Sequence, residues 1–291
     1  MFSILGEMQE MNFTRLLSGA RRSERMIVGD IMNKDPVCVN VTDLMTHARQ
    51  VMRDKHLHSL PVMDGNGRVV GMLDDQDILR LQSNRSEVTV GGYAREFPLI
   101  TPDMEIRDAT RSLLDARQHR APVVTSSTDR SIAGVLNDTT LLRHVRLMKL
   151  PARNVSEIMN TKVRTIYPDD TVSKVWGNML EWDYTGIPVI SHENEVMGIV
   201  TRSDIIKAGF ARPGNRASEA HDSASGDSPK VEKLMSTPLY SISPRTTISK
   251  AIETILSYDV GRICVTDNKQ LLGIVDKFSL LKECLAGPGF E

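Results

Sequence analysis

Apolar and polar residues follow a regular order along this chain, and the same order occurs four times. Each copy contains one segment with apolar positions at offsets 0, 3, 4, 7 and 8, which is the stripe of an amphipathic helix. The stripes begin at Leu44, Ile106, Val172 and Ile248. Recurrence of one pattern at a nearly fixed period predicts a fold built from similar repeats.

Two short apolar segments follow each of these helices, with a polar turn between them. The first segments read LPVMD, APVVT, IPVIS and ICVTD, and the second read RVVGML, SIAGVL, EVMGIV and QLLGIV. Apolar segments joined by a turn such as Gly65-Asn66-Gly67 predict a β-hairpin. A second helix closes each copy, so each repeat is β-α-β-β-α and the expected class is α/β, more strictly α+β.

The four copies account for most of the chain. They open with VGDIM, VGGYA, VSEIM and VEKLM, and we expect the repeats to span residues 27–84, 88–148, 153–208 and 231–285. A single repeat has a small interior, so we expect repeat 1 to pair with repeat 2 and repeat 3 with repeat 4.

Two segments fall outside the repeats. Residues 209–230 are rich in Gly, Ala, Ser and Pro and have almost nothing to bury, which predicts a flexible linker. Residues 1–26 contain loosely helical apolar positions before GARRSER. We interpret this N-terminal segment as either a short docking helix or a disordered tail.

Composition excludes several classes of function. With 36 basic and 37 acidic residues the net charge is −1, so no overall field attracts nucleic acid or anionic lipid. No apolar segment reaches the roughly 18 residues of a membrane span. The three cysteines are far apart in sequence, which fits a reducing cytoplasm. We therefore expect a cytoplasmic protein with no membrane span and no nucleic-acid partner.

Catalytic signatures are also missing from the sequence. It contains no G-x-S-x-G elbow, no Walker loop and no H-E-x-x-H motif, and its seven histidines lack the spacing of metal ligands. We expect no enzymatic activity, no metal and no required cofactor.

The polar tetrad Thr201-Arg202-Ser203-Asp204 directly follows the third hairpin. A threonine at this place is a favoured helix N-cap, and an acid three residues later nearly completes a capping box. The other copies carry equally good capping residues at the threonine position: Asp74, Asn137 and Asp276.

The aspartate position behaves differently from the threonine position. It carries Asp77 in repeat 1 and Asp204 in repeat 3, but Thr140 in repeat 2 and Ser279 in repeat 4. Capping does not require such an alternation. We therefore interpret Asp204, and with less support Asp77, as candidate ligand-binding carboxylates.

The order of these motifs, M-x-x-x-h-x-h, then h-P-V, then G-h-h-T-x-x-D, resembles the CBS domain, named after cystathionine beta-synthase. The resemblance covers residues 27–285 in four copies. In that family two repeats form a Bateman module, whose cleft commonly holds an adenosyl ligand. The resemblance implies that Thr201 contacts phosphate or the ribose side and that Asp204 accepts both ribose hydroxyls, a charge-assisted pair of hydrogen bonds.

The resemblance nominates further residues for the same cleft. Arg262 and Arg120 would reach phosphates, and Gly186 would allow close approach of a flat base. Thr165, Ile166 and Ile187 would flank adenine, although a plain core role is the better explanation of both isoleucines. An ion pair with an acid is an equally good explanation of Arg262.

Repeat 1 differs from repeat 3 at the position of the phosphate-binding residue. Asp74 would repel a phosphate there, so that cleft would favour an uncharged or cationic nucleoside, or stay empty.

The resemblance implies a stand-alone regulatory protein that binds AMP, ADP, ATP or S-adenosylmethionine and signals to a protein partner, such as a regulated enzyme or transporter. The alternative is a structural or interaction scaffold with degenerate clefts. The two modules either pack on each other within one chain as a disc or meet those of a second chain in a homodimer, and the sequence does not choose between these arrangements.

Overall fold

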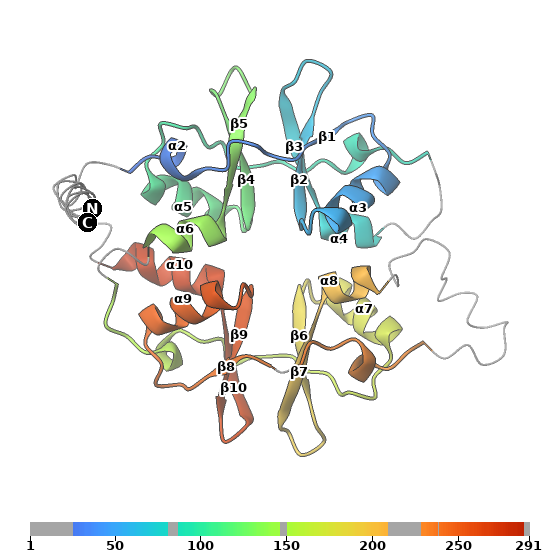
Figure 1. Cartoon of the computed structure of the whole chain (residues 1–291), viewed down its shortest axis with the longest axis vertical. Coiled ribbons are helices and arrows are strands. Elements are labelled where there is room, and N and C mark those ends of the chain that lie inside the picture. Colours follow the sequence, from blue (N-terminus) through green and yellow to red (C-terminus); the bar gives the residue numbers. More distant parts are fainter. Residues whose placement is uncertain (1–25, 81–86, 146–149, 209–227, 238, 288–291) are drawn as a thin grey trace, which may run out of the picture.

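The computed structural model describes residues 26–80, 87–145, 150–208, 228–237 and 239–287. The predictions for residues 1–25 and for residues 209–227 of the linker lie outside these ranges. Figure 1 shows four similar units around a ring, with repeats 1 and 2 in one half and repeats 3 and 4 in the other. The strands of each half lie in its middle, and the helices flank them.

Each repeat contains a hairpin between two helices, which confirms the α+β class. Repeat 1 contains β1 (Val39–Asn40), α3 (Met45–Asp54), β2 (Ser59–Met63), β3 (Val69–Asp74) and α4 (Asp75–Arg80). Repeat 2 contains α5 (Ile106–Asp115), β4 (Arg120–Val124), β5 (Ile132–Asn137) and α6 (Asp138–Val145). Repeat 3 contains α7 (Val172–Glu181), β6 (Gly186–Ile190), β7 (Val196–Thr201) and α8 (Arg202–Lys207). Repeat 4 contains β8 (Ser241–Ile242), α9 (Ile248–Ser257), β9 (Arg262–Asp267), β10 (Gln270–Asp276) and α10 (Lys277–Ala286).

The strand before the first helix is complete in only two repeats. β1 pairs parallel with β2, and β8 pairs parallel with β9. In repeats 2 and 3 the same pairing is reduced to single parallel bridges, Ile100 with Val123 and Ile166 with Val189. The hairpins themselves are antiparallel in all four repeats.

The predicted apolar stripes face the core in three of the four first helices. In α5, α7 and α9 the residues at offsets 0, 3 and 7 are all buried. In repeat 1 the predicted register is wrong by one residue, because Leu44 is the N-cap of α3 and is 39% exposed, whereas Met45, Ala48 and Met52 are buried. The helix begins one residue later than the pattern suggested.

The opening turns lie on the neighbouring repeat and not on their own. They are α2 (Val28–Ile31) and the short 3-10 helices η1 (Val90–Tyr93), η2 (Val155–Glu157) and η3 (Val231–Lys233). The Val28 amide donates to the Met104 carbonyl in repeat 2 at 2.9 Å, and the Val90 amide donates to the Asp43 carbonyl in repeat 1 at 2.8 Å. Repeats 3 and 4 exchange their turns in the same way. Each module is therefore interlocked, because each motif precedes the rest of its own repeat in the sequence and packs on the other repeat of the module.

This exchange explains the glycine that recurs in the second strand of every hairpin. A Cβ at Gly134 would lie 2.6 Å from the Asn33 carbonyl oxygen and 2.9 Å from the Met32 sulfur, both in the exchanged turn. A Cβ at Gly71, Gly198 or Gly273 would make equivalent close contacts with the opening turn of the other repeat. The strand needs glycine because the opening turn of the other repeat in the module packs directly against it.

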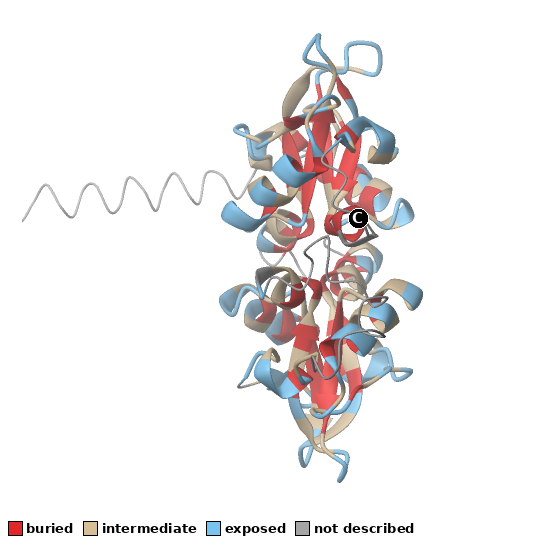
Figure 2. Ribbon diagram, turned by 90° about the vertical axis from the view of Figure 1, so that its right-hand side faces the viewer, coloured by how far each residue is buried: buried red, intermediate tan, exposed pale blue. Residues whose placement is uncertain are grey.

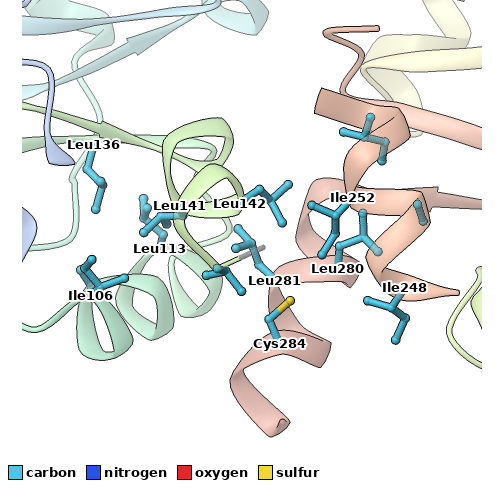
Figure 3. Close-up of a cluster of buried hydrophobic side chains, with 14 of the residues drawn as sticks. Ile106, Leu113, Leu136, Leu141, Leu142, Ile248, Ile252, Leu280, Leu281 and Cys284 are labelled. Atoms are coloured by element: carbon cyan, nitrogen blue, oxygen red, sulfur yellow. The ribbon is translucent and has the colours of Figure 1, made fainter. Parts of the chain in front are cut away.

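The two modules pack on each other within one chain. A single apolar core includes Leu141, Leu142 and Val145 of α6 together with Leu280 and Leu281 of α10. Figure 3 shows α6 side chains facing those of α10 across this junction. The cores of repeats 1 and 3 stay separate from it. The disc arrangement is thus present in a single chain, held mainly through repeats 2 and 4.

Buried residues follow the strands along the interior of both modules, and exposed residues cover the outer helices and loops (Figure 2). Among the residues that the structure describes, no helix combines the length and apolar character needed to cross a bilayer. The last three residues of the predicted linker contact repeat 3, where the Ser228 hydroxyl accepts a hydrogen bond from the Ser173 amide at 3.1 Å.

Candidate ligand cleft

Three of the nominated residues meet where repeat 3 faces repeat 4. Gly186 of β6 and Thr201 of β7 are directly paired in the hairpin. Arg262 begins β9 and donates from Nη1 to the Gly186 carbonyl at 3.0 Å. A Cβ at Gly186 would lie 3.3 Å from Thr201 Cγ2 and 3.6 Å from Arg262 Cδ. The structure therefore brings Gly186, Thr201 and Arg262 together where the hairpins of repeats 3 and 4 meet, and this place is the candidate cleft.

Thr201 and Asp204 form a complete capping box at the start of α8. The Thr201 amide and hydroxyl both donate to Asp204 Oδ2, at 2.8 and 2.6 Å, and the Asp204 amide donates to Thr201 Oγ1 at 3.2 Å. The other carboxylate oxygen, Oδ1, accepts a long hydrogen bond from the Ser236 hydroxyl at 3.5 Å. Asp204 thus caps the helix with one oxygen and keeps the other weakly engaged.

Arg262 is a largely buried cation with no ion-pair partner among the described residues. Burial lowers the pKa of its guanidinium, with the neighbouring Arg202 adding to this effect and Asp276 opposing it. No carboxylate within the described part of the chain lies within ion-pair distance of Arg262, although Asp276, its pairing residue in the hairpin, acts on it electrostatically. The sequence-based alternative of an acid beside Arg262 therefore stays open. A buried guanidinium in this state favours an anion beside it.

The residues nominated for adenine lie next to this cleft but are mostly part of the core. The Ile166 amide donates to the Pro188 carbonyl at 3.1 Å, which places the Thr165–Ile166 segment alongside β6. Ile166 and Ile187 are both buried in the repeat 3 core, whereas Thr165 is half-buried. Their side chains support the cleft wall, and Thr165 keeps partial access to solvent.

Repeat 1 has the equivalent geometry with different chemistry. Arg120 begins β4 and donates from Nη1 to the Ser59 carbonyl at 3.2 Å, matching the contact between Arg262 and Gly186. Asp77 accepts from the Asp74 amide at 3.1 Å and forms an ion pair with Arg95 of the exchanged turn. The carboxylate that would accept ribose hydroxyls in repeat 1 is therefore already paired.

Asp74 adds a second obstacle in repeat 1. Burial, together with the adjacent carboxylates Asp75 and Asp77, raises the pKa of Asp74 to about 6. At neutral pH the side chain is an anion at the position that Thr201 occupies in repeat 3. Repeat 1 consequently disfavours phosphate at this place.

Capping alone accounts for the equivalent residues of the even repeats. The Thr140 amide donates to Asn137 Oδ1 at 2.8 Å, and the Ser279 amide donates to Asp276 Oδ1 at 2.8 Å. In both repeats the side-chain oxygen of the N-cap residue, Asn137 or Asp276, accepts the hydrogen bond of the helix amide.

Two residues of the clefts were not expected from the sequence, Ser236 beside Asp204 and Arg95 beside Asp77. Both follow the exchanged opening motif directly, and both pair through backbone hydrogen bonds with the partner's glycine-containing strand, Ser236 with Ile199 and Arg95 with Met72. Both residues stand directly after an opening motif in the sequence. This shared position identifies them only when it is known that the opening turn packs on the other repeat of the module.

Two concavities lie away from these residues. A groove of about 750 Å³ runs along α9 between Ser241 and Tyr258, and a cavity of about 30 Å³ lies between repeats 1 and 3, lined by His58, Asp75 and Ser203 among others. In the described ranges, no three His, Cys, Asp or Glu side chains gather as a metal site.

Four repeats, each with a hairpin between two helices and interlocked in two pairs, define a tandem-repeat module protein. The model of the CBS domain matches residues 28–84, 90–147, 155–211 and 231–286, which is more than half of the sequence. The chain belongs to the CBS-domain family.

Relatives share the fold at low sequence identity. The uncharacterized protein MJ1404 of Methanocaldococcus jannaschii is 25% identical over 88% of this chain, which spans 61% of that protein's length. The crystal structure of MJ1225 from the same organism, described as a proposed archaeal homolog of g-AMPK, is 20% identical with a TM-score of 0.75, covering 88% of this chain and 99% of that one. A Pyrococcus horikoshii protein is similar at 17% identity and a TM-score of 0.61, covering 89% and 100%.

Proposed function

We propose that this protein is a regulatory sensor that binds an adenosyl ligand, AMP, ADP, ATP or S-adenosylmethionine, in the cleft of repeat 3. The observation that carries the proposal is Arg262, a largely buried guanidinium that has a carbonyl partner but no carboxylate partner among the described residues. Thr201 lies on the same side of the cleft. The negative charge beside Arg262 would come from phosphate in AMP, ADP or ATP, and from the carboxylate in S-adenosylmethionine.

The remaining groups fit the ribose end of such a ligand. Among the described residues, Asp204 Oδ1 is engaged only by the long contact from Ser236, so vicinal hydroxyls can replace this hydrogen bond and gain charge-assisted ones. Arg262 would have to exchange its contact with the Gly186 carbonyl for one with phosphate. Ligand binding is thus coupled to rearrangement of the strand ends that join repeats 3 and 4.

The proposal assigns the strong site to repeat 3 and not to repeat 1. In repeat 1 the ion pair between Asp77 and Arg95 blocks the ribose carboxylate, and ionised Asp74 opposes phosphate. That cleft remains suited to an uncharged or cationic nucleoside that displaces Arg95.

Regulation requires that the ligand stabilise one arrangement of the disc more than another, since a ligand shifts an equilibrium only by its differential affinity. A protein partner, such as an enzyme or transporter, would then read the changed surface. The likeness to the proposed g-AMPK homolog MJ1225 is a likeness of fold, and the proposal rests on the cleft residues of this chain.

A thermal-shift panel with AMP, ADP, ATP, S-adenosylmethionine, adenosine and GTP tests the proposal. A ligand that binds only the folded state at a hundredfold excess over Kd adds about 2.7 kcal/mol of stability. We expect a shift with an adenine ligand, absent with GTP and reduced by Asp204→Ala.

The competing function is an assembly scaffold with degenerate clefts. The capping box favours it, because Thr201 and Asp204 satisfy each other without any ligand. A panel with no shift for any compound would support the scaffold and contradict the sensor.

A further inference from the structure

The closing helices of the four repeats meet at the junction between the modules. In Figure 1, α6 faces α10 and α4 faces α8 across this junction. The first residues of these helices are Asp75, Asp138, Arg202 and Lys277. Five charged residues are buried in the part of the chain that the structure describes, and four of them are these helix-initial residues. Their burial therefore belongs to the contact between modules.

Repeat 1 meets repeat 3 through charged groups. Arg202 Nη1 lies 3.6 Å from Asp75 Oδ1, and Arg202 Nη2 lies 3.0 Å from Asp183 Oδ1. The Gln76 side-chain amide donates to Asp183 Oδ1 at 2.8 Å. A cavity of about 30 Å³ lies beside these contacts and is lined by Asp75 of repeat 1 and Ser203 of repeat 3, among others.

Repeat 2 meets repeat 4 through a second cross-module pair. Lys277 Nζ donates to Thr139 Oγ1 at 2.6 Å and lies 3.8 Å from Asp138 Oδ1. His119 contacts both sides, with Nδ1 2.8 Å from Asp138 Oδ2 and its ring against Phe278 at a centroid distance of 4.4 Å. The same sign pattern is present as at the other contact, an acid on the first module and a base on the second.

The apolar part of the junction does not discriminate between partners. Leu141 and Leu142 of α6 lie opposite Leu280 and Leu281 of α10 (Figure 3). Leucine faces of this kind bury apolar area against any similar face. Selectivity must come from the buried charges.

We propose that these four charges form a pairing code, by which the junction face of the first module accepts the second module and rejects a copy of itself. If two first modules met with repeats 1 and 2 in parallel order, Asp75 would face Asp75 and Asp138 would face Asp138. In the opposite order Asp75 would face Asp138. Both arrangements bury carboxylates against each other, and such like-charge contacts suppress incorrect partners.

The second module excludes itself in the same way. Arg202 and Lys277 would face each other or themselves in either order. Asp183 reduces this repulsion at Arg202 only, because it pairs with that guanidinium within the same repeat. The Asp183 side chain is itself 75% exposed. The code therefore favours closure of one chain into a disc over dimers built from like modules.

Charge reversal in the full chain tests the code. One variant carries Arg202→Asp and Lys277→Asp, so that both faces are acidic; a second carries Asp75→Lys and Asp138→Lys, so that both are basic; a third carries all four changes. The neutral variant Arg202→Gln with Lys277→Gln is the matched control. Shape is measured by small-angle X-ray scattering and sedimentation velocity at low salt, where charge contacts are least screened.

We expect the all-acidic and all-basic chains to open, with a larger radius of gyration and slower sedimentation than the wild type. The four-fold variant should regain the wild-type values, and the neutral control should remain compact. An equimolar mixture of the all-acidic and all-basic chains should form a one-to-one dimer that neither forms alone.

Two results overturn the proposal. One is that both reversed chains stay as compact as the wild type and remain monomeric when mixed. The other is that the four-fold variant fails to regain the compact form. This second result contradicts the proposal even if a reversed chain has lost its native circular dichroism spectrum.

Discussion

Replacing Asp74 by Asn removes a carboxyl group that the folded protein holds in an unfavourable place. Burial and the neighbouring carboxylates Asp75 and Asp77 raise the pKa of Asp74 from 3.8 to about 6. Asparagine keeps the size of the side chain and is the residue that repeat 2 carries at the same position, Asn137. The substitution therefore tests the electrostatic penalty with little change in shape.

The size and sign of the effect follow from the pKa of Asp74. The folded protein binds its proton more tightly than the unfolded chain does, so this group favours the folded state below about pH 4. The advantage disappears as the pH rises through about 6. At about 1.4 kcal/mol per pKa unit, ionisation costs up to about 3 kcal/mol at neutral pH. Asp74→Asn should recover most of this free energy at pH 7.5 and none at pH 4.

Thermal unfolding of the wild type and Asp74→Asn between pH 4 and 8 measures the difference. Each kcal/mol raises the melting temperature by about 2–4 °C in domains of moderate size, so a gain of several degrees is expected at pH 7.5. The same chemical change at exposed Asp115 is the control and should have little effect. An equal gain at pH 4 and pH 7.5, or no gain at either, would refute the electrostatic argument.

Three further predictions concern the fold and its caps. Gly134→Ala should lower the free energy of unfolding by about 1–3 kcal/mol in urea titrations, because its Cβ would lie 2.6 Å from the Asn33 carbonyl oxygen; Gly65→Ala, with open space around it, is the control, and equal effects of the two would contradict the turn exchange. Leu142→Ala should cost about 2–5 kcal/mol by leaving a cavity at the junction, and a loss below 1 kcal/mol would show that the modules do not share a core. Thr201→Ala should cost about 1 kcal/mol through loss of the cap, whereas Thr201→Ser should be near neutral; equal losses would argue against the capping role.

The periodic pattern was sufficient to predict the secondary structure and the repeats. Helical stripes and hairpin turns are local signals, so each β-α-β-β-α unit could be predicted from its own residues. The register error at Leu44 arose because Met45 is also apolar, and an alternative stripe one residue later fits nearly as well. Only packing against the hairpin selects Met45.

The sequence could not show which repeat each opening turn contacts. Each turn is followed along the chain by the hairpin of its own repeat, yet it packs on the neighbouring repeat. This non-local contact places Arg95 beside Asp77 and Ser236 beside Asp204, and it makes two otherwise equivalent aspartates chemically different. The choice between a disc and separate modules likewise depends on side chains, such as Lys277 and Asp138, that meet only in three dimensions.

Arg262 has no ion-pair partner among the described residues, and the proposed adenosyl phosphate would supply one. Isothermal titration calorimetry of AMP and ATP against the wild type, Arg262→Gln and Arg120→Gln tests it most directly, because Arg120 has the equivalent backbone contact in repeat 1. Loss of a hydrogen bond to a charged group costs about 1.5–3 kcal/mol. We expect one strong nucleotide site in the wild type, at least tenfold weaker nucleotide binding in Arg262→Gln, and near wild-type affinity in Arg120→Gln. Unchanged affinity in Arg262→Gln, or no binding heat with either nucleotide, would contradict it.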